Sequence, residues 1–320
     1  MEKFTLGINL VICMSTIVVK GIVMFYSGIN FMDTAYACRK KYTASDHAKY
    51  GIDRYLKECK KFNKLYTLAW LMSIAITFVP DILNLIITGE KRYPFLIEFP
   101  AFVHADSNFV YPFLYVYLAF GFSSSTVSMV TFDLLFFNLI TVISMEFDIL
   151  GQEIRNLKDV EESNIPKELR KIHERQIDLY EIVDKMEKYF ALPNAYNFFM
   201  ISIIMCFFAF VLSTSTDSSD TMKNAVYGGS TLFQLYLQNN FAQLLINASE
   251  NIHYAFYECG WENFTDIKSK KALIMCLMRT KKPSSVTLCK FGDLSLEQFR
   301  YAMLRAYSYF TLCLNVYRKS

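Results

Sequence analysis

The feature that most constrains this chain is a series of long apolar runs separated by charged segments. A helix needs about 20 residues to cross the hydrocarbon core of a bilayer, and it satisfies its own backbone polar groups on the way. The runs long enough for this lie near residues 6–32, 65–89, 109–143, 190–213, 225–247 and 298–316. A shorter run, ALIMCLM at 272–278, is expected to form a buried or interfacial cytoplasmic helix. The pattern predicts an all-α, polytopic transmembrane helix bundle with six full spans and a short helix before the last.

Composition supports this class. Hydrophobic residues make up 53% of the chain and charged residues only 20%, which would leave a soluble protein too little polar surface. The net charge of +3 is too small to suggest a nucleic-acid partner. No pair among the eight cysteines has metal-ligand spacing, and the four histidines are dispersed. We therefore expect no metal, no cofactor and no enzymatic activity.

The basic residues predict an orientation in the membrane. Segments 33–64, 144–189 and 248–297 carry nine, eight and seven Lys or Arg residues, whereas the alternate flanks carry six altogether. Cytoplasmic loops are enriched in Lys and Arg, so these three segments are expected to face the cytoplasm. Both ends of the chain as given would then lie outside.

Two charges interrupt the apolar runs, and each is costly in lipid unless it is paired or functional. Asp133 lies in the third run, which is long enough to continue beyond the membrane. We expect Asp133 near the cytoplasmic end of that run, bonded to a neighbouring helix. Lys20 lies midway along the first run and could extend its ammonium group toward the interface.

The last ninety residues carry a specific resemblance. A mostly apolar helix from Thr231 runs through Ser-Glu and Ala-Phe-Tyr to Trp261, and is followed by the basic turn MRTKKP at 278–283. TLCKFGDLSLEQF at 287–299 and AMLRAYSYFTLCLN at 302–315 come next. In order and spacing this series resembles the C-terminal third of insect odorant receptors, seven-transmembrane proteins of inverted topology. Six spans with an external N-terminus match that topology without its first span. The resemblance implies one membrane-embedded receptor or channel domain over 1–320, lacking the family's N-terminal segment and first span.

The resemblance also implies a function. It predicts an odorant receptor subunit that binds small volatile organic ligands and gates a non-selective cation channel in the sensory transduction of smell. The implied partner is the shared odorant co-receptor, in a hetero-tetramer within the lipid of the plasma membrane of olfactory sensory neurons.

Candidate residues follow from the family's architecture. The outer halves of the first, second, third and fifth runs are expected to line the ligand pocket, with Ile12, Ser15, Val19, Ser73, Thr77, Phe78, Tyr115, Tyr117, Phe120, Tyr227 and Phe233 as candidates. By alignment on Tyr309 and Phe310, the last helix places the pore constriction at Leu312 and a polar position at Asn315. Subunit contacts are expected from Tyr257, Gly260, Trp261, Tyr307 and Ser308.

Three other functions stay open at this point. A gustatory-type receptor of the same superfamily would end in Thr-Tyr…Gln-Phe, whereas this chain carries Ala-Tyr-Ser-Tyr-Phe. A secondary transporter would show internal repeats and helices broken at matching places. No repeat is present, and Pro80, Pro112 and Pro193 are expected near helix ends. A structural or accessory membrane protein is the third alternative.

Overall fold

The computed structural model describes residues 15–23, 53–93, 107–214, 218–289 and 291–319. These residues form helices and their connections, and no strand occurs among them. After a helix over 15–23, the long helices are α2 (Asp53–Thr88), α3 (Val110–Arg155), α4 (Ile165–Thr214) and α5 (Ser218–Tyr257). The shorter α6 (Ile267–Thr280) and α7 (Leu296–Lys319) follow. Single 3-10 turns at Asn156–Asp159, Glu162–Asn164 and Trp261–Asn263 join α3 to α4 and follow α5. The predicted all-α bundle is confirmed.

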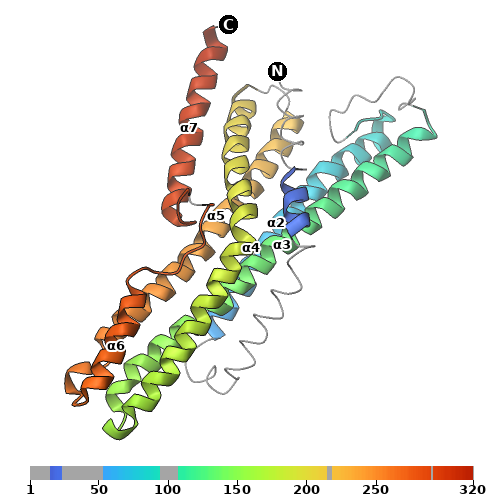
Figure 1. The fold of residues 1–320 in the computed structure, drawn as a ribbon. Coiled ribbons are helices and arrows are strands. Elements are labelled where there is room, and N and C mark those ends of the chain that lie inside the picture. Colours follow the sequence, from blue (N-terminus) through green and yellow to red (C-terminus); the bar gives the residue numbers. More distant parts are fainter. Residues whose placement is uncertain (1–14, 24–52, 94–106, 215–217, 290, 320) are drawn as a thin grey trace.

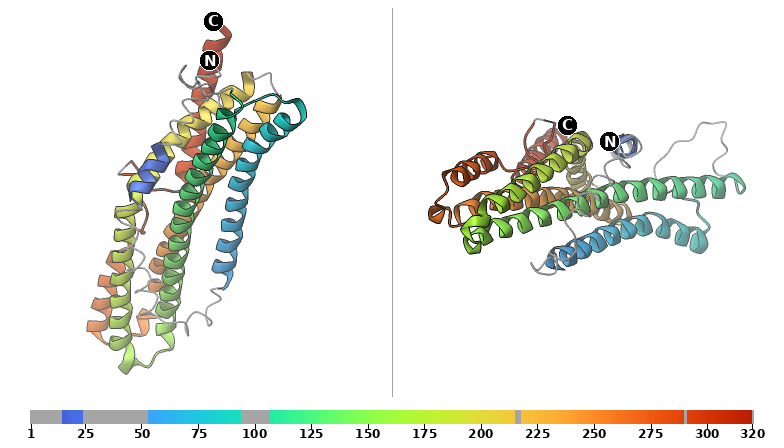
Figure 2. Two further views of the ribbon diagram at one scale, coloured as in Figure 1. Left: turned by 90° about the vertical axis from the view of Figure 1, so that its right-hand side faces the viewer. Right: turned by 60° about the horizontal axis from the view of Figure 1, so that its bottom comes forward.

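The helices form an elongated bundle in which α2, α3, α4 and α5 run side by side, while α7 extends from one side toward one end of the bundle (Figure 1, Figure 2). The α3–α4 and α5–α6 connections lie together at the opposite end (Figure 1). Thr265, after α5, donates both its backbone N–H and its hydroxyl to the Glu162 carboxylate between α3 and α4. Two of the three basic segments therefore share one end, as the positive-inside pattern requires.

Helix length explains the shape. At about 1.5 Å per residue, the 46 residues of α3 span about 70 Å, more than twice the roughly 30 Å hydrocarbon core of a bilayer. The third run thus continues as helix beyond any single span, as predicted. Within the described residues, three helices are long and apolar enough to cross a membrane: Tyr55–Thr88, Val110–Asp159 and Glu162–Phe210.

Runs 225–247 and 298–316 form continuous helix in α5 and α7 but are not among those three. In α5, the buried polar side chains of Gln234, Gln238 and Asn239 lower the apolar content while facing the bundle interior. Of run 6–32, the structure describes the helix at 15–23, and the rest lies outside the described residues.

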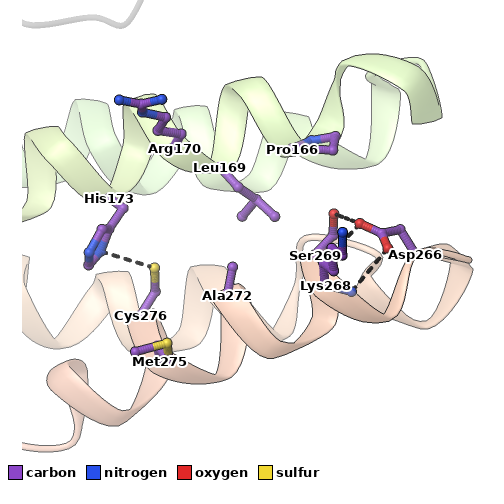
Figure 3. A pocket seen from close by; sticks show the side chains of 10 residues that line it. All are labelled: Pro166, Leu169, Arg170, His173, Asp266, Lys268, Ser269, Ala272, Met275 and Cys276. Carbon is purple, nitrogen blue, oxygen red and sulfur yellow. Dashed lines mark hydrogen bonds between the residues drawn. The ribbon is translucent and has the colours of Figure 1, made fainter.

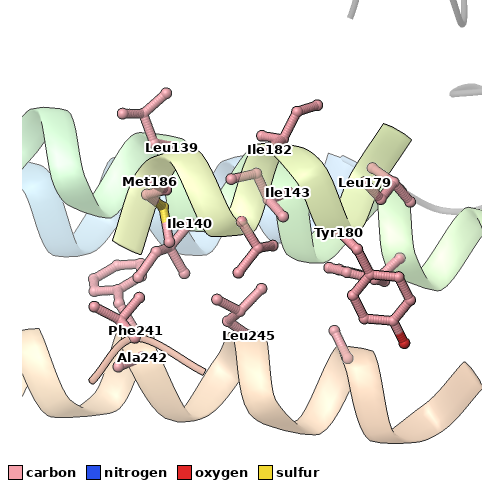
Figure 4. Close-up of a cluster of buried hydrophobic side chains, with 14 of the residues drawn as sticks. Leu139, Ile140, Ile143, Leu179, Tyr180, Ile182, Met186, Phe241, Ala242 and Leu245 are labelled. Atoms are coloured by element: carbon pink, nitrogen blue, oxygen red, sulfur yellow. The ribbon is translucent and has the colours of Figure 1, made fainter. Parts of the chain in front are cut away.

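The core runs along α3, α4 and α5. On α3, Phe136, Phe137, Ile140, Phe147 and Leu150 have no exposed surface. They fall at spacings of three, four and seven residues along the helix, which puts them on one helical face. Figure 4 shows this cluster, with Leu139, Ile140 and Ile143 of α3 against Leu179, Ile182 and Met186 of α4 and Phe241, Ala242 and Leu245 of α5. Phe137 stacks on Phe241 at 4.7 Å between ring centroids.

A buried ionic cluster joins α3 to α4 closer to their connected ends. Arg175 of α4 donates from Nη2 to Glu146 Oε2 at 2.7 Å and from Nη1 to Glu153 Oε1 at 2.5 Å. The Arg175 side chain is 6% exposed, that of Glu146 3% and that of Glu153 31%. A planar guanidinium that bonds two carboxylates on one helix fixes the relative position of α3 and α4.

The prolines correct one expectation. Pro193 lies well inside α4 and Pro80 inside α2, whereas only Pro112 lies at the start of its helix. The apolar run from residue 190 suggested a helix start there, but α4 begins at Ile165 with an amphipathic stretch. Because its apolar face packs against α3, the helix continues through Pro193 instead of ending there.

Candidate functional site

A buried carboxylate lies at the centre of the bundle. Asp133 is fully buried midway along α3 and accepts hydrogen bonds from four side chains. Lys20 Nζ and Gln238 Nε2 donate to its Oδ1 at 2.6 and 3.2 Å. Tyr66 Oη and Gln234 Nε2 donate to its Oδ2 at 2.6 and 2.7 Å. An ionised carboxylate offers about four lone-pair sites, so these donors fill them.

The bonds continue from Asp133 to α4. Gln238 Oε1 accepts from Asn197 Nδ2 at 2.8 Å. The resulting polar network consists of Lys20, Tyr66, Asp133, Asn197, Gln234 and Gln238, each at most 2% exposed. Its members come from the helix over 15–23 and from α2, α3, α4 and α5, so it joins five helices at one level of the bundle.

The structure pairs these two charges with each other. Asp133 bonds to neighbouring helices, as predicted, and it lies midway along α3, which continues beyond any single span to Arg155. Its place near the cytoplasmic end of the span stays a prediction. The Lys20 side chain is 2% exposed and turned inward, so it does not extend toward an interface. Its Nζ also lies 5.5 Å from the centre of the Phe132 ring. Burial removes solvation from both charges, and the ion pair with Asp133 offsets part of that cost.

An aromatic layer covers one side of the polar network. It consists of Tyr66 and Trp70 of α2, Phe208 of α4, and Tyr227 and Phe233 of α5. Tyr66 contacts Phe233 and Trp70, both at 6.5 Å between ring centroids. Trp70 contacts Tyr227 at 5.9 Å, and Tyr227 contacts Phe208 at 5.4 Å. Two of the predicted ligand residues, Tyr227 and Phe233, belong to this layer.

Other predicted ligand residues form a second aromatic group between α2 and α3. Phe78 and Tyr115 contact each other at 6.0 Å, and the Tyr115 hydroxyl donates to the Phe78 carbonyl at 2.8 Å. They cluster with Tyr111, Phe122 and Ile74, apart from the main core. Ser73, 2% exposed, lies between the two aromatic groups in the sequence of α2, and its Oγ has no hydrogen-bond partner among the described residues.

The remaining ligand candidates are dispersed. Tyr117 and Phe120 are each 74% exposed on α3, so the structure does not bring them to the buried aromatic residues. Thr77 donates its hydroxyl to the Ser73 carbonyl in its own helix. Ser15, half-buried, accepts from Tyr196 of α4 at 2.7 Å, and Val19 is also half-buried beside Lys20. Ile12 lies outside the described residues.

Sequence reasoning missed Tyr66, Trp70, Asn197, Gln234 and Gln238. A usable signal existed on α5: Gln234 and Gln238 are four residues apart in an apolar segment, which places both amides on one helical face. Tyr66 carries no such signal, because its role depends on the approach of α2 to α3.

The predicted pore residues lie on an exposed face of α7. Leu312 is 61% exposed and Asn315 is exposed, in line with Leu304 and Ser308 at helical spacing. The buried residues Ala302 and Ala306 mark another face, and α7 packs against α4 and α5. Tyr236 of α5 meets Phe299 of α7 at 5.9 Å. Within one chain, the Leu312 face thus has room for further subunits.

Most predicted subunit-contact residues are also exposed. Tyr257, Trp261 and Tyr307 are 54%, 41% and 65% exposed, and Ser308 is exposed. Gly260 has a different role within the chain. Its φ of +73° belongs to the left-handed region that favours glycine, and a Cβ there would lie 3.1 Å from Lys158 Cβ. Gly260 allows the chain to turn after α5 close to the α3–α4 connection.

A cavity of about 460 Å³ lies between α4 and α6 (Figure 3), and its α4 residues come 24 or more positions before Asn197 of the polar network. Its lining includes Leu169, Arg170 and His173 of α4 facing Ala272 and Cys276 of α6. The Cys276 thiol lies 3.5 Å from His173 Nδ1, but burial raises the pKa of this thiol to about 11. The thiol is therefore protonated at neutral pH and a poor nucleophile or metal ligand.

Taken together, the helical bundle, its apolar spans and its buried aromatic and polar groups define a polytopic helical membrane protein. A family model described as 7tm Odorant receptor matches residues 1–307. The chain belongs to this family. Of the odorant and gustatory receptor types that the sequence left open, the family model matches the odorant type.

Individual relatives of the chain are also odorant receptors. Odorant receptor 67a of Drosophila melanogaster is 25% identical over 296 residues, which cover 88% of this chain and 72% of the relative. Odorant receptor 85c of the same species is 24% identical over 284 residues, 86% of this chain and 72% of the relative. Among solved structures, the olfactory receptor OR5 of Machilis hrabei in complex with eugenol has a TM-score of 0.82 at 15% identity. That match covers 98% of this chain and 82% of OR5, so the fold is the same.

Proposed function

We propose that this chain is the odorant-binding subunit of a ligand-gated, non-selective cation channel that it forms with an odorant co-receptor. The observation that carries the proposal is the fold, which matches over nearly the whole chain a receptor solved with eugenol bound. Eugenol is a small aromatic molecule, and the bundle of this chain holds buried aromatic groups of matching chemistry. The subunit acts in the plasma membrane of olfactory sensory neurons, in the sensory transduction of smell.

The proposed ligand site lies along the aromatic layer and the second aromatic group, on the side of the polar network nearer the end of α2 and the start of α3. Phe78, Tyr115, Tyr227 and Phe233 supply apolar surface, and burial of a volatile ligand there stabilises the complex by about 25 cal/mol per Å². Ser73 Oγ, buried without a partner among the described residues, supplies a hydroxyl that can bond a ligand oxygen.

The deciding experiment is electrophysiology. Cells that express the chain together with an insect odorant co-receptor are expected to give odorant-evoked cation current, and cells that express the chain alone little or none. A panel of small aromatic and aliphatic volatiles provides the ligands. Second-messenger output that depends on a G protein, without any current, would contradict the channel.

The exposed face of α7 leads to a prediction about the gate. Leu312 is proposed to form an apolar constriction with the partner subunits, and Asn315 a polar step beside it. An apolar ring closes a pore by excluding water, so Leu312→Ser is expected to raise ligand-free current severalfold. Asn315→Lys adds a positive charge and is expected to reduce cation conductance by electrostatic repulsion.

The matched control is Leu304→Ser, two turns earlier on the same exposed face of α7. Under the proposal it leaves the ligand-free current close to that of the unmodified channel. Unchanged leak in Leu312→Ser together with unchanged permeability in Asn315→Lys would exclude these residues from the pore.

A further inference from the structure

The aromatic layer and the polar network meet at Tyr66. Its side chain is fully buried, and its ring touches Phe233, Trp70 and, at 5.6 Å, Phe137. Its hydroxyl donates to Asp133 at 2.6 Å. Because protein interiors are close-packed, a displacement of Phe233 or Trp70 shifts the Tyr66 ring, and the ring carries its hydroxyl with it. Such a displacement therefore changes the hydrogen bond between Tyr66 and Asp133.

Asp133 passes such a displacement to α5. Its four acceptor positions are filled by Lys20, Tyr66, Gln234 and Gln238. A change in the Tyr66 bond alters the balance among the other three donors, because they share one carboxylate in a low-dielectric interior. Two of those donors are on α5, one turn apart, and Gln238 also accepts from Asn197 of α4. Rotation of α5 is thus opposed by bonds to both α3 and α4.

The same turn of α5 contacts α7. Tyr236 lies between Gln234 and Gln238 in sequence and meets Phe299 of α7 at 5.9 Å. Farther along α5, Gln243 Oε1 accepts from the backbone N–H of Leu296, the first residue of α7, at 3.4 Å. Gln234 and Gln238 therefore bond one side of α5 to α3 and α4, while another side of α5 contacts the start of α7.

We propose that Tyr66, Asp133, Gln238 and Asn197 are positioning residues that couple ligand occupancy of the aromatic layer to the placement of α5 and α7. This inference rests on the proposed function, since it assumes both the ligand site and the α7 pore. It assigns to the polar network a part in opening the channel in addition to holding the bundle together.

The test is a double-mutant cycle between the two ends of the network. Tyr66→Phe keeps the ring and removes only the hydroxyl bonded to Asp133. Asn197→Ala removes the amide bonded to Gln238. The two sites are on different helices, and no hydrogen bond links them directly. Odorant concentration–response curves, ligand-free current and surface abundance are measured for both single variants and the pair, with the co-receptor present.

We expect each single variant to shift the half-maximal odorant concentration by about fivefold or more, within the usual range of coupling between sites. The pair is expected to shift it by clearly less than the product of the two single shifts, because either change already breaks the same connection. Independent sites add within about twofold, so a product within that limit would overturn the proposal. A change in surface abundance alone, with an unaltered curve, would also overturn it by reducing the network to a structural role.

The control is Thr141→Val, which removes a buried α3 hydroxyl that donates to Phe137 in its own helix. It is expected to leave the curve in place. Should Tyr66→Phe fail to reach the surface, Gln234→Met removes a different bond to the same Asp133 oxygen. Because Gln234 bonds Asp133 and Asn197 bonds Gln238, the pair Gln234→Met and Asn197→Ala gives the same discrimination. Absence of odorant current in the unmodified chain would refute the proposed function itself and is separate from any result of the cycle.

Discussion

Replacing Lys20 by Met is expected to lower the surface abundance of the protein severalfold. The change leaves the Asp133 carboxylate fully buried without the ammonium that lies 2.6 Å from its Oδ1. Removing one partner of a buried ion pair costs about 3–5 kcal/mol, because the remaining charge keeps its desolvation penalty. A loss of only 1–2 kcal/mol already changes the cellular abundance of a protein several-fold. Surface biotinylation measures the effect.

The second arm of this experiment neutralises the remaining charge. Lys20→Met combined with Asp133→Asn is expected to recover a large part of the lost abundance, because an amide is far less costly to bury than an uncompensated carboxylate. Lys185→Met is the matched control, since its pair with Glu181 is exposed and such pairs contribute little. Equal losses in Lys20→Met and Lys185→Met would show that the buried pair does not stabilise the bundle.

Replacing Arg175 by Met is expected to be comparably damaging at the other level of the bundle. Arg175 bonds Glu146 and Glu153, and Glu146 is 3% exposed. The variant removes the cation that two carboxylates of α3 share, seven residues or about two turns of helix apart. The expected cost is again about 3–5 kcal/mol, the cost of breaking a buried pair. It should appear as a lower midpoint of thermal unfolding for the detergent-purified protein.

The companion change is Glu146→Gln, which removes the more buried of the two charges and should restore part of the midpoint in the Arg175→Met background. Arg170→Met, five residues earlier on α4, serves as control because its pair with Glu174 is exposed on both sides. If Arg175→Met unfolds at the same temperature as Arg170→Met, the cluster contributes no net stability.

Much of the fold could be predicted from the sequence, for a physical reason. A backbone that crosses lipid must satisfy its own polar groups, so a long apolar run has little choice but to be a helix. This is why the predicted runs at 65–89, 109–143 and 190–213 fall within α2, α3 and α4 to within one residue, and why the brief run at 272–278 lies in the short helix α6. Helix ends were harder to predict, because α4 continues as helix through Pro193 and begins 25 residues before the apolar run.

The candidate site, too, could be predicted only in part from the sequence. Asp133 was singled out from sequence because a charge within an apolar run is costly unless it is bonded. Its hydrogen-bond partners could not be predicted in this way, since Lys20 and Tyr66 are 113 and 67 residues away along the chain. Similarly, Tyr117 and Phe120 share the aromatic composition of Tyr115, yet only Tyr115 turns inward. Composition records that a side chain is aromatic but not which side of the helix meets a neighbour.

The sequence by itself determined that this chain is a helical membrane protein of the odorant receptor type. Hydropathy and charge act locally, and the motifs from Thr231 to Asn315 lie within one stretch of chain. Only the tertiary structure decided that Lys20, Tyr66, Gln234 and Gln238 converge on Asp133, and that Leu312 lies on an open face of α7. Such contacts depend on the rotation and register of packed helices, which are set by the fit of side chains from segments far apart in the chain.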